Sequence, residues 1–156
     1  MVIGFSKNDL SGVLYPHNNP LVVTMRVHET RVSRILIDNG SSADIIFYNY
    51  FHSLGLRDKK MEPYHRPLIG FSGEKVYLLG TVKLEVLIGT WPGSKTERIH
   101  FFVLDKNIRS AYNIILGRVD LEKFIAVPST AHQCLKFPTY YRVGIVTGNQ
   151  VEAKEC

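Results

Sequence analysis

Residues 34–42 read Arg34-Ile35-Leu36-Ile37-Asp38-Asn39-Gly40-Ser41-Ser42, so an aliphatic run ends in an acid that is followed by a turn dipeptide. A short apolar run bounded by a turn signal is typical of a buried strand, and Asn-Gly is a strong turn signal. A carboxylate at the end of such a strand costs free energy unless it has a partner or a use. The pattern therefore predicts that Asp38 is presented on a tight loop at the edge of the core.

This segment alone leaves two interpretations open. Strands often end in Asp-Asn-Gly simply because these residues form turns, and such a turn needs no function. A catalytic interpretation requires a second reacting group. The rest of the chain has to decide between them.

The length and composition limit the classes of protein to which this chain can belong. A chain of 156 residues with an apolar fraction of 45% has the size and the core of one domain. No apolar run approaches the roughly 20 residues that span a bilayer, and no signal peptide is recognisable, so we expect no membrane contact and an intracellular, cytoplasmic protein. Cys134 and Cys156 make no disulfide framework, and the His residues lack the spacing of a metal site. We expect neither a metal nor an organic cofactor.

The net charge of +5 is mildly basic. Its Lys and Arg residues are spread along the chain, whereas a dedicated nucleic-acid-binding protein usually has a denser patch. Most of these charges are expected to form a solvated surface, and nonspecific contact with RNA stays open as an alternative.

The remaining patterns predict a mainly β domain. A hairpin of residues 21–27 and 32–37 leads into Asp38, and residues 43–54 have helical spacing, with Ser41 or Ser42 as cap and Asp44 as a first-turn partner. Extended arms flank residues 70–73, and the second arm alternates between apolar and charged side chains. Strands at 97–104 and 111–118 and a short helix at 119–124 follow. We expect an N-terminal extension (1–19), the folded domain (20–138) and a C-terminal tail (139–156).

The order of these pieces resembles a retropepsin, the aspartic protease of retroviruses and retrotransposons, and most of all the protease region of plant Ty3/Gypsy-type polyproteins. The matching segments cover roughly residues 10–156, and they are residues 38–45, 55–56, 70–73 and 111–118. The resemblance implies a retropepsin-like closed β-barrel or sandwich with a flap hairpin and one or two short helices. It also implies an aspartic endopeptidase that cleaves a retroelement polyprotein, in the cytoplasm or within virus-like particles.

The resemblance assigns roles to residues of this chain. Asp38 is the catalytic acid-base, and an extended polypeptide is the substrate. The active-site loop is completed by Asn39, Gly40 and Ser41; the flap is formed by Ile69, Gly70, Phe71, Ser72 and Gly73; and structural support comes from Ile115, Leu116, Gly117 and Arg118.

The number of candidate catalytic acids in one chain determines how many chains an active enzyme needs. No other Asp of the chain is followed by x-Gly, so one chain supplies one carboxylate, while the mechanism of aspartic proteases uses two that share a proton. An active enzyme must therefore be a homodimer with its two-fold axis between two copies of Asp38.

One departure from the family pattern keeps a second reading open. The residue after the catalytic Asp is usually Thr or Ser, and here it is Asn39. An amide also donates and accepts hydrogen bonds, but it is larger and not β-branched. The alternative is therefore a catalytically inactive retropepsin-like module that binds peptides or dimerises. A nucleic-acid-binding accessory domain is a third reading, based on the net charge alone.

Overall fold

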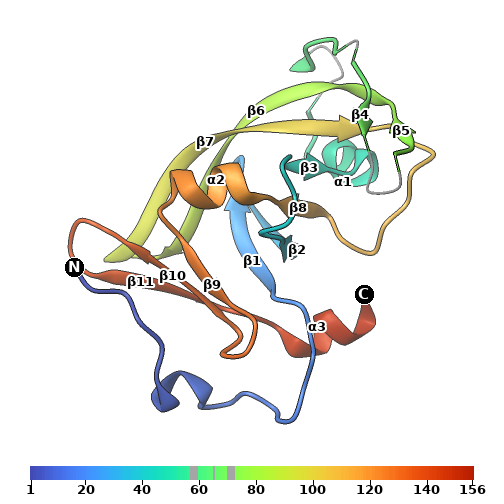
Figure 1. Ribbon diagram of the computed structural model, residues 1–156. Coiled ribbons are helices and arrows are strands. Elements are labelled where there is room, and N and C mark those ends of the chain that lie inside the picture. The colour runs from blue at the N-terminus through green and yellow to red at the C-terminus, as the bar shows by residue number, and fades with distance from the viewer. Residues whose placement is uncertain (57–59, 65, 70–72) are drawn as a thin grey trace.

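The computed structural model describes residues 1–56, 60–64, 66–69 and 73–156. Within these residues the chain is mainly β, and six strands close a barrel in the order β1-β2-β8-β3-β7-β6 (Figure 1). This confirms the expected mainly β architecture with a closed barrel. The barrel strands are β1 (Val22–Val27), β2 (Thr30–Ile37), β3 (Ile45–Ile46), β6 (Leu78–Thr90), β7 (Gly93–Leu104) and β8 (Ile114–Leu116).

The long β6–β7 hairpin supplies two strands of the barrel, and its β6 strand follows the alternation seen in the sequence. Val82, Leu84, Val86 and Ile88 are buried in the core, whereas Lys83 between them is exposed. Successive side chains of a strand point to opposite faces, so one face of this hairpin is solvated while the other closes the core.

The β1–β2 hairpin leads to the site, as the sequence predicted. Its strands pair antiparallel, with Val22 opposite Leu36 and Val27 opposite Thr30. Strand β8 then lies parallel to β2, so that a segment almost 80 residues further along the chain runs beside the end of β2. The short helix α2 (Arg118–Lys123) follows β8 directly, close to the predicted range.

The helix expected over residues 43–54 is shorter than its spacing suggested. Ile45 and Ile46 form β3, which pairs with both β7 and β8, and helix α1 covers only Tyr48–Ser53. The cap of α1 is Phe47, without a side-chain hydrogen bond, so neither Ser41 nor Ser42 caps it. Two β-branched residues between two strands gain sheet hydrogen bonds on both sides, and this outweighs helical spacing.

Residues 139–156, expected as a tail, contain regular structure. A separate sheet is formed by β9 (Val127–Ser129), β10 (Cys134–Pro138) and β11 (Val143–Thr147), and helix α3 (Gln150–Glu155) follows it. Val146 and Ala153 are buried, so this segment belongs to the packed body. Apolar residues two apart in 143–147 were the available signal, and antiparallel pairing with the preceding strand β10 makes this segment a strand.

The N-terminal extension also packs onto the domain. It contains a short 3-10 helix, η1 (Lys7–Leu10), and the Asp9 carboxylate pairs with the Lys136 ammonium of β10 at 2.9 Å. The Leu14 N–H donates to the Gln150 side chain of α3 at 2.9 Å. In the described part of the chain, no helix has the length and apolar character needed to cross a membrane.

Candidate active site

Asp38 directly follows β2, at the point where β2 and β8 run side by side. Ile37 lies opposite Leu116 in the parallel register, and the Asp38 N–H donates to the Leu116 carbonyl at 2.9 Å. Strand β8 thus holds the first residue of the loop by its backbone.

The candidate active-site loop, residues 38–41, is a tight turn that orients the carboxylate of its own first residue. The Ser41 N–H donates to the Asp38 carbonyl at 3.1 Å, and the Gly40 N–H donates to Asp38 Oδ1 at 3.0 Å. A Cβ at position 40 would lie only 3.3 Å from that oxygen. Asp38 is half-buried, while Asn39 and Gly40 are exposed. The carboxylate is therefore fixed in direction yet open to a ligand.

Gly117 and Arg118 connect this loop to α2. The Arg118 N–H donates to the Ser41 carbonyl at 2.8 Å. A Cβ at Gly117 would lie 2.7 Å from the Ser41 oxygen and 2.6 Å from the Ala43 oxygen, so only glycine allows this approach. The Arg118 side chain is exposed, and its support of the loop in this chain comes through its backbone.

Asp44 is a site residue that the sequence reasoning missed. Its side chain is only 4% exposed, and Oδ1 accepts the Gly117 N–H at 2.7 Å. Its carbonyl accepts the Phe102 N–H of β7 at 2.8 Å. Asp44 was read as a partner of a helix start, but it ties the loop to β7 and α2. The available signal was the β-branched pair that follows it, which disfavours a helix there.

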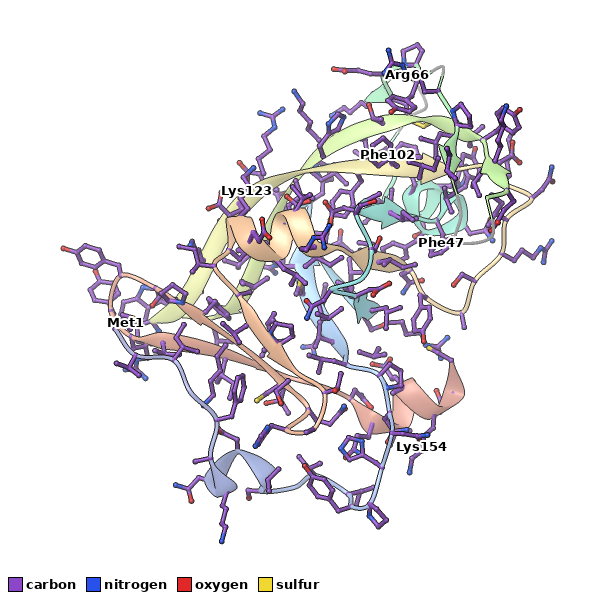
Figure 2. All side chains as sticks on the ribbon, in the orientation of Figure 1. Met1, Phe47, Arg66, Phe102, Lys123 and Lys154 are labelled. Carbon is purple, nitrogen blue, oxygen red and sulfur yellow. The ribbon has the colours of Figure 1, made fainter. Side chains whose placement is uncertain are left out.

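A row of apolar side chains leads away from Asp38 on the face opposite the core. The strand registers place Leu36 beside Ile115, Ile115 beside Ile45, and Ile45 beside Phe102, and all four side chains are half-buried. Leu36 and Asp38 are two positions apart, so both leave the strand on the same side. Phe102 is labelled in Figure 2. Of the four residues expected as structural support, Leu116 faces the core and Ile115 belongs to this row.

A hairpin lies where the sequence placed the expected flap. Strands β4 (Leu68–Ile69) and β5 (Lys75–Val76) pair antiparallel, with Ile69 opposite Lys75. Ile69 is 75% exposed, and Gly73 has a φ of +82°, a conformation that favours glycine. Gly70, Phe71 and Ser72 lie outside the described residues.

The described residues contain no group of three or more His, Cys, Asp and Glu side chains that could hold a metal ion. The chemistry offered by the site is that of a backbone-oriented carboxylate beside an apolar row.

Comparisons with known proteins agree with this geometry. No protein-family model and no curated protein matches the sequence. Among solved structures, the chain is similar to the retroviral protease-like domain of Ddi1 from Leishmania major, with a TM-score of 0.58 and 16% identity over 82% of this chain and 94% of that one. It is also similar to a retropepsin-like aspartic protease from Rickettsia conorii, with a TM-score of 0.51 and 18% identity over 81% of each chain. The chain therefore has a retropepsin-like fold.

Proposed function

We propose that this protein is an aspartic endopeptidase of retropepsin type that acts as a homodimer. The proposal rests on the Asp38 carboxylate, whose Oδ1 accepts a hydrogen bond from the Gly40 N–H at 3.0 Å. The loop that carries this carboxylate is hydrogen-bonded to β8 through the Leu116 carbonyl and packs closely against Gly117. A turn that served only to reverse the chain would need no such support. The fold of the solved neighbours agrees with this assignment.

In the proposed mechanism a water molecule lies between two Asp38 carboxylates that share one proton. The ionised carboxylate takes a proton from the water as its oxygen attacks the peptide carbonyl, and the protonated one donates to the carbonyl oxygen. The proton is then passed to the leaving amine as the C–N bond breaks. The Gly40 N–H stabilises the ionised form of the carboxylate by a charge-assisted hydrogen bond.

The second carboxylate has to come from a second copy of the chain. Asp44 is committed to the Gly117 N–H, and Asp120 is buried in α2. Asp38 itself lies beside exposed residues, so a partner can approach it. A two-fold axis that passes between two copies of this loop satisfies the chemistry.

The proposed substrate is an extended polypeptide with apolar side chains near the scissile bond. The row of Leu36, Ile115 and Ile45 offers half-buried apolar surface beside Asp38, and the β4–β5 hairpin can pair with a peptide in the manner of an added strand. On the strength of the sequence resemblance, we further propose that the substrate is the polyprotein of a retroelement of the plant Ty3/Gypsy type, processed in the cytoplasm or in virus-like particles.

A second candidate is a catalytically inactive module that dimerises or binds peptides through the same surface. Asn39 favours it, because this residue stands where the family places a hydroxyl, and its side chain is exposed beside Asp38. The module and the enzyme share the fold and differ in whether a bound peptide is cut.

The test compares the wild-type chain with Asp38→Asn, which keeps the size of the side chain and removes the ionisable acid. Both proteins are incubated with a peptide library at pH 4–6, and their circular dichroism spectra establish that both are folded. Pepstatin-sensitive cleavage by the wild type and none by the variant is expected. Equal cleavage by both proteins contradicts the proposed site, and absence of cleavage with retained peptide binding supports the module.

A further inference from the structure

The apolar row beside Asp38 ends at Phe102, and beyond Phe102 the outward-facing side chains of β7 are basic instead of apolar. Each step between neighbouring strands is about 4.8 Å, so the three steps from β2 to β7 cover roughly 14 Å, or about four residues of an extended peptide. A peptide that follows the row from Asp38 therefore reaches Phe102 with its distal residues. Those residues then meet the next outward-facing positions of β7, which are His100 and Arg98.

Three basic side chains gather at this point. His100 and Arg98 are exposed on β7, and Lys83 lies directly opposite His100 on β6. Two surface cavities of about 270 Å³ and 540 Å³ share these three residues as lining, and the second cavity also reaches Phe102. The three side chains thus form a basic ridge between two hollows, next to the end of the apolar row.

Charge near the ridge is only partly balanced. The ion pairs in the described part of the chain involve Arg34 and Lys136, and none reaches the ridge. Glu85 lies opposite Arg98 across the strands, and Glu62 lines the smaller cavity. Lys83 and Arg98 have no salt-bridge partner among the described residues, so an added anion would gain a favourable interaction with both side chains.

Further charged residues line the larger cavity, and they affect where an anion can bind. Asp44 lines it, but its Oδ1 is already bonded to the Gly117 N–H. Asp120 lines it too, and burial raises the pKa of that carboxyl, although Lys123 opposes the shift. Lys123, labelled in Figure 2, donates its ammonium to the Arg98 carbonyl and so adds a positive charge beside the ridge.

We propose that Lys83, Arg98 and His100 form a distal subsite that selects polypeptide substrates with an acidic residue about four to six positions from the scissile bond. This inference rests on the proposed function, because it takes the row beside Asp38 as the path of the substrate. A two-fold symmetric dimer carries the subsite at both ends of the cleft, so the acid is accepted on either side of the cut.

The test uses two peptides that share an apolar centre and differ by Glu or Gln at the distal positions. For the wild type, kcat/KM for the Glu peptide is expected to exceed that for the Gln peptide roughly fivefold at low salt, as a few partly exposed ion pairs allow. In a variant with Lys83→Gln, Arg98→Gln and His100→Gln the ratio falls to about one. The matched control is Arg31→Gln, an exposed cation of β2, which leaves the ratio unchanged.

A binding experiment tests the subsite independently of the proposed catalysis. The same fluorescent peptides are titrated into Asp38→Asn, which binds without cutting, and the same preference for Glu is expected in Kd. If the wild type cuts neither peptide, the proposed function fails, while the binding ratio still decides the subsite. A ratio of one in the wild type or in Asp38→Asn, or an unchanged ratio in the triple variant, overturns the subsite. Displacement of the Gln peptide by a short single-stranded RNA, together with a ratio of one, would assign the ridge to nucleic acid instead.

Discussion

The Asp38 loop and the β4–β5 hairpin are both short, turn-rich segments, but the molecule holds them in opposite ways. Backbone groups of β8 and α2 bond the loop at Asp38 and Ser41, and no side chain fits at Gly117 beneath it. The hairpin consists of two strands of two residues each, paired to one another, with Ile69 projecting into solvent.

This difference matches two tasks of the proposed hydrolase, which are to hold a carboxylate in a fixed position and to cover the substrate. A carboxylate that must meet a second carboxylate has to be fixed before the substrate arrives, because reorganisation during the reaction would raise the barrier. A hairpin that covers the substrate gains from weak attachment, since two-residue strands contribute little stability of their own. Substitutions in the loop should therefore alter folding and activity together, whereas substitutions in the hairpin should alter activity alone.

The strongest test of this contrast is Gly117→Ala. The added methyl group would press on the Ser41 and Ala43 carbonyl oxygens, so we expect the free energy of unfolding to fall by about 2–3 kcal/mol, with loss of peptide cleavage. Urea denaturation measures the change. Gly4→Ala is the control, since nothing lies within 4 Å of a Cβ there. An unchanged stability of Gly117→Ala would show that the loop is not held as described.

The second test removes the acceptor beneath the loop. Asp44→Ala leaves the Gly117 N–H buried without a partner, which should cost about 1–3 kcal/mol. Asp44→Asn keeps an oxygen in place and should recover most of this loss. Thermal unfolding of the three proteins compares them, and equal destabilisation by Ala and Asn would mean that the negative charge matters and the acceptor does not.

A third test addresses the packing of the N-terminal segment. This segment is held by a surface ion pair, so its attachment to the domain is expected to be weak, like that of the hairpin and unlike that of the loop. The hydrogen bond from Lys136 lowers the pKa of Asp9 below its ordinary value of 3.8, and the Ser6 N–H adds to the effect. A lowered pKa contributes stability above pH 3.8 that is lost as the pH falls through the folded-state value. The melting temperature of Asp9→Asn should therefore lie below that of the wild type at pH 6. The difference should vanish in strong acid, and a difference that persists there would exclude the ion pair as its cause.

The smallest effect on folding is expected in the hairpin. Ile69 is 75% exposed, so Ile69→Ser should change the free energy of unfolding by less than about 0.5 kcal/mol. If the hairpin binds the peptide, the same variant should raise KM severalfold. Steady-state kinetics and urea denaturation on one preparation give both values. A large loss of stability would remove the contrast between hairpin and loop.

Sequence reasoning worked where local patterns and ordered motifs carry the information. The hairpin that leads to Asp38, the alternation of Val82 to Ile88 and the strand at Leu116 all lie where the sequence placed them. It failed where a distant contact decides the local structure. Asp44 accepts a hydrogen bond from a residue 73 positions further on, and this contact depends on the closed barrel and leaves no periodic signal in the sequence. The β11 strand is a different case, because its apolar residues two apart were a visible signal, and it pairs with the preceding strand β10 in a separate sheet.

In the proposed dimer, two chains each contribute one Asp38 to a shared site, and a subunit-mixing experiment can show whether both are needed. Wild-type protein is mixed with an equal amount of Asp38→Asn, allowed to exchange subunits, and assayed for peptide cleavage per wild-type chain. The proposed dimer predicts a fall to about half, because half of the wild-type chains then sit in mixed dimers with a single acid. An activity per wild-type chain that does not change on mixing would show that one chain is sufficient and would rule out the shared site.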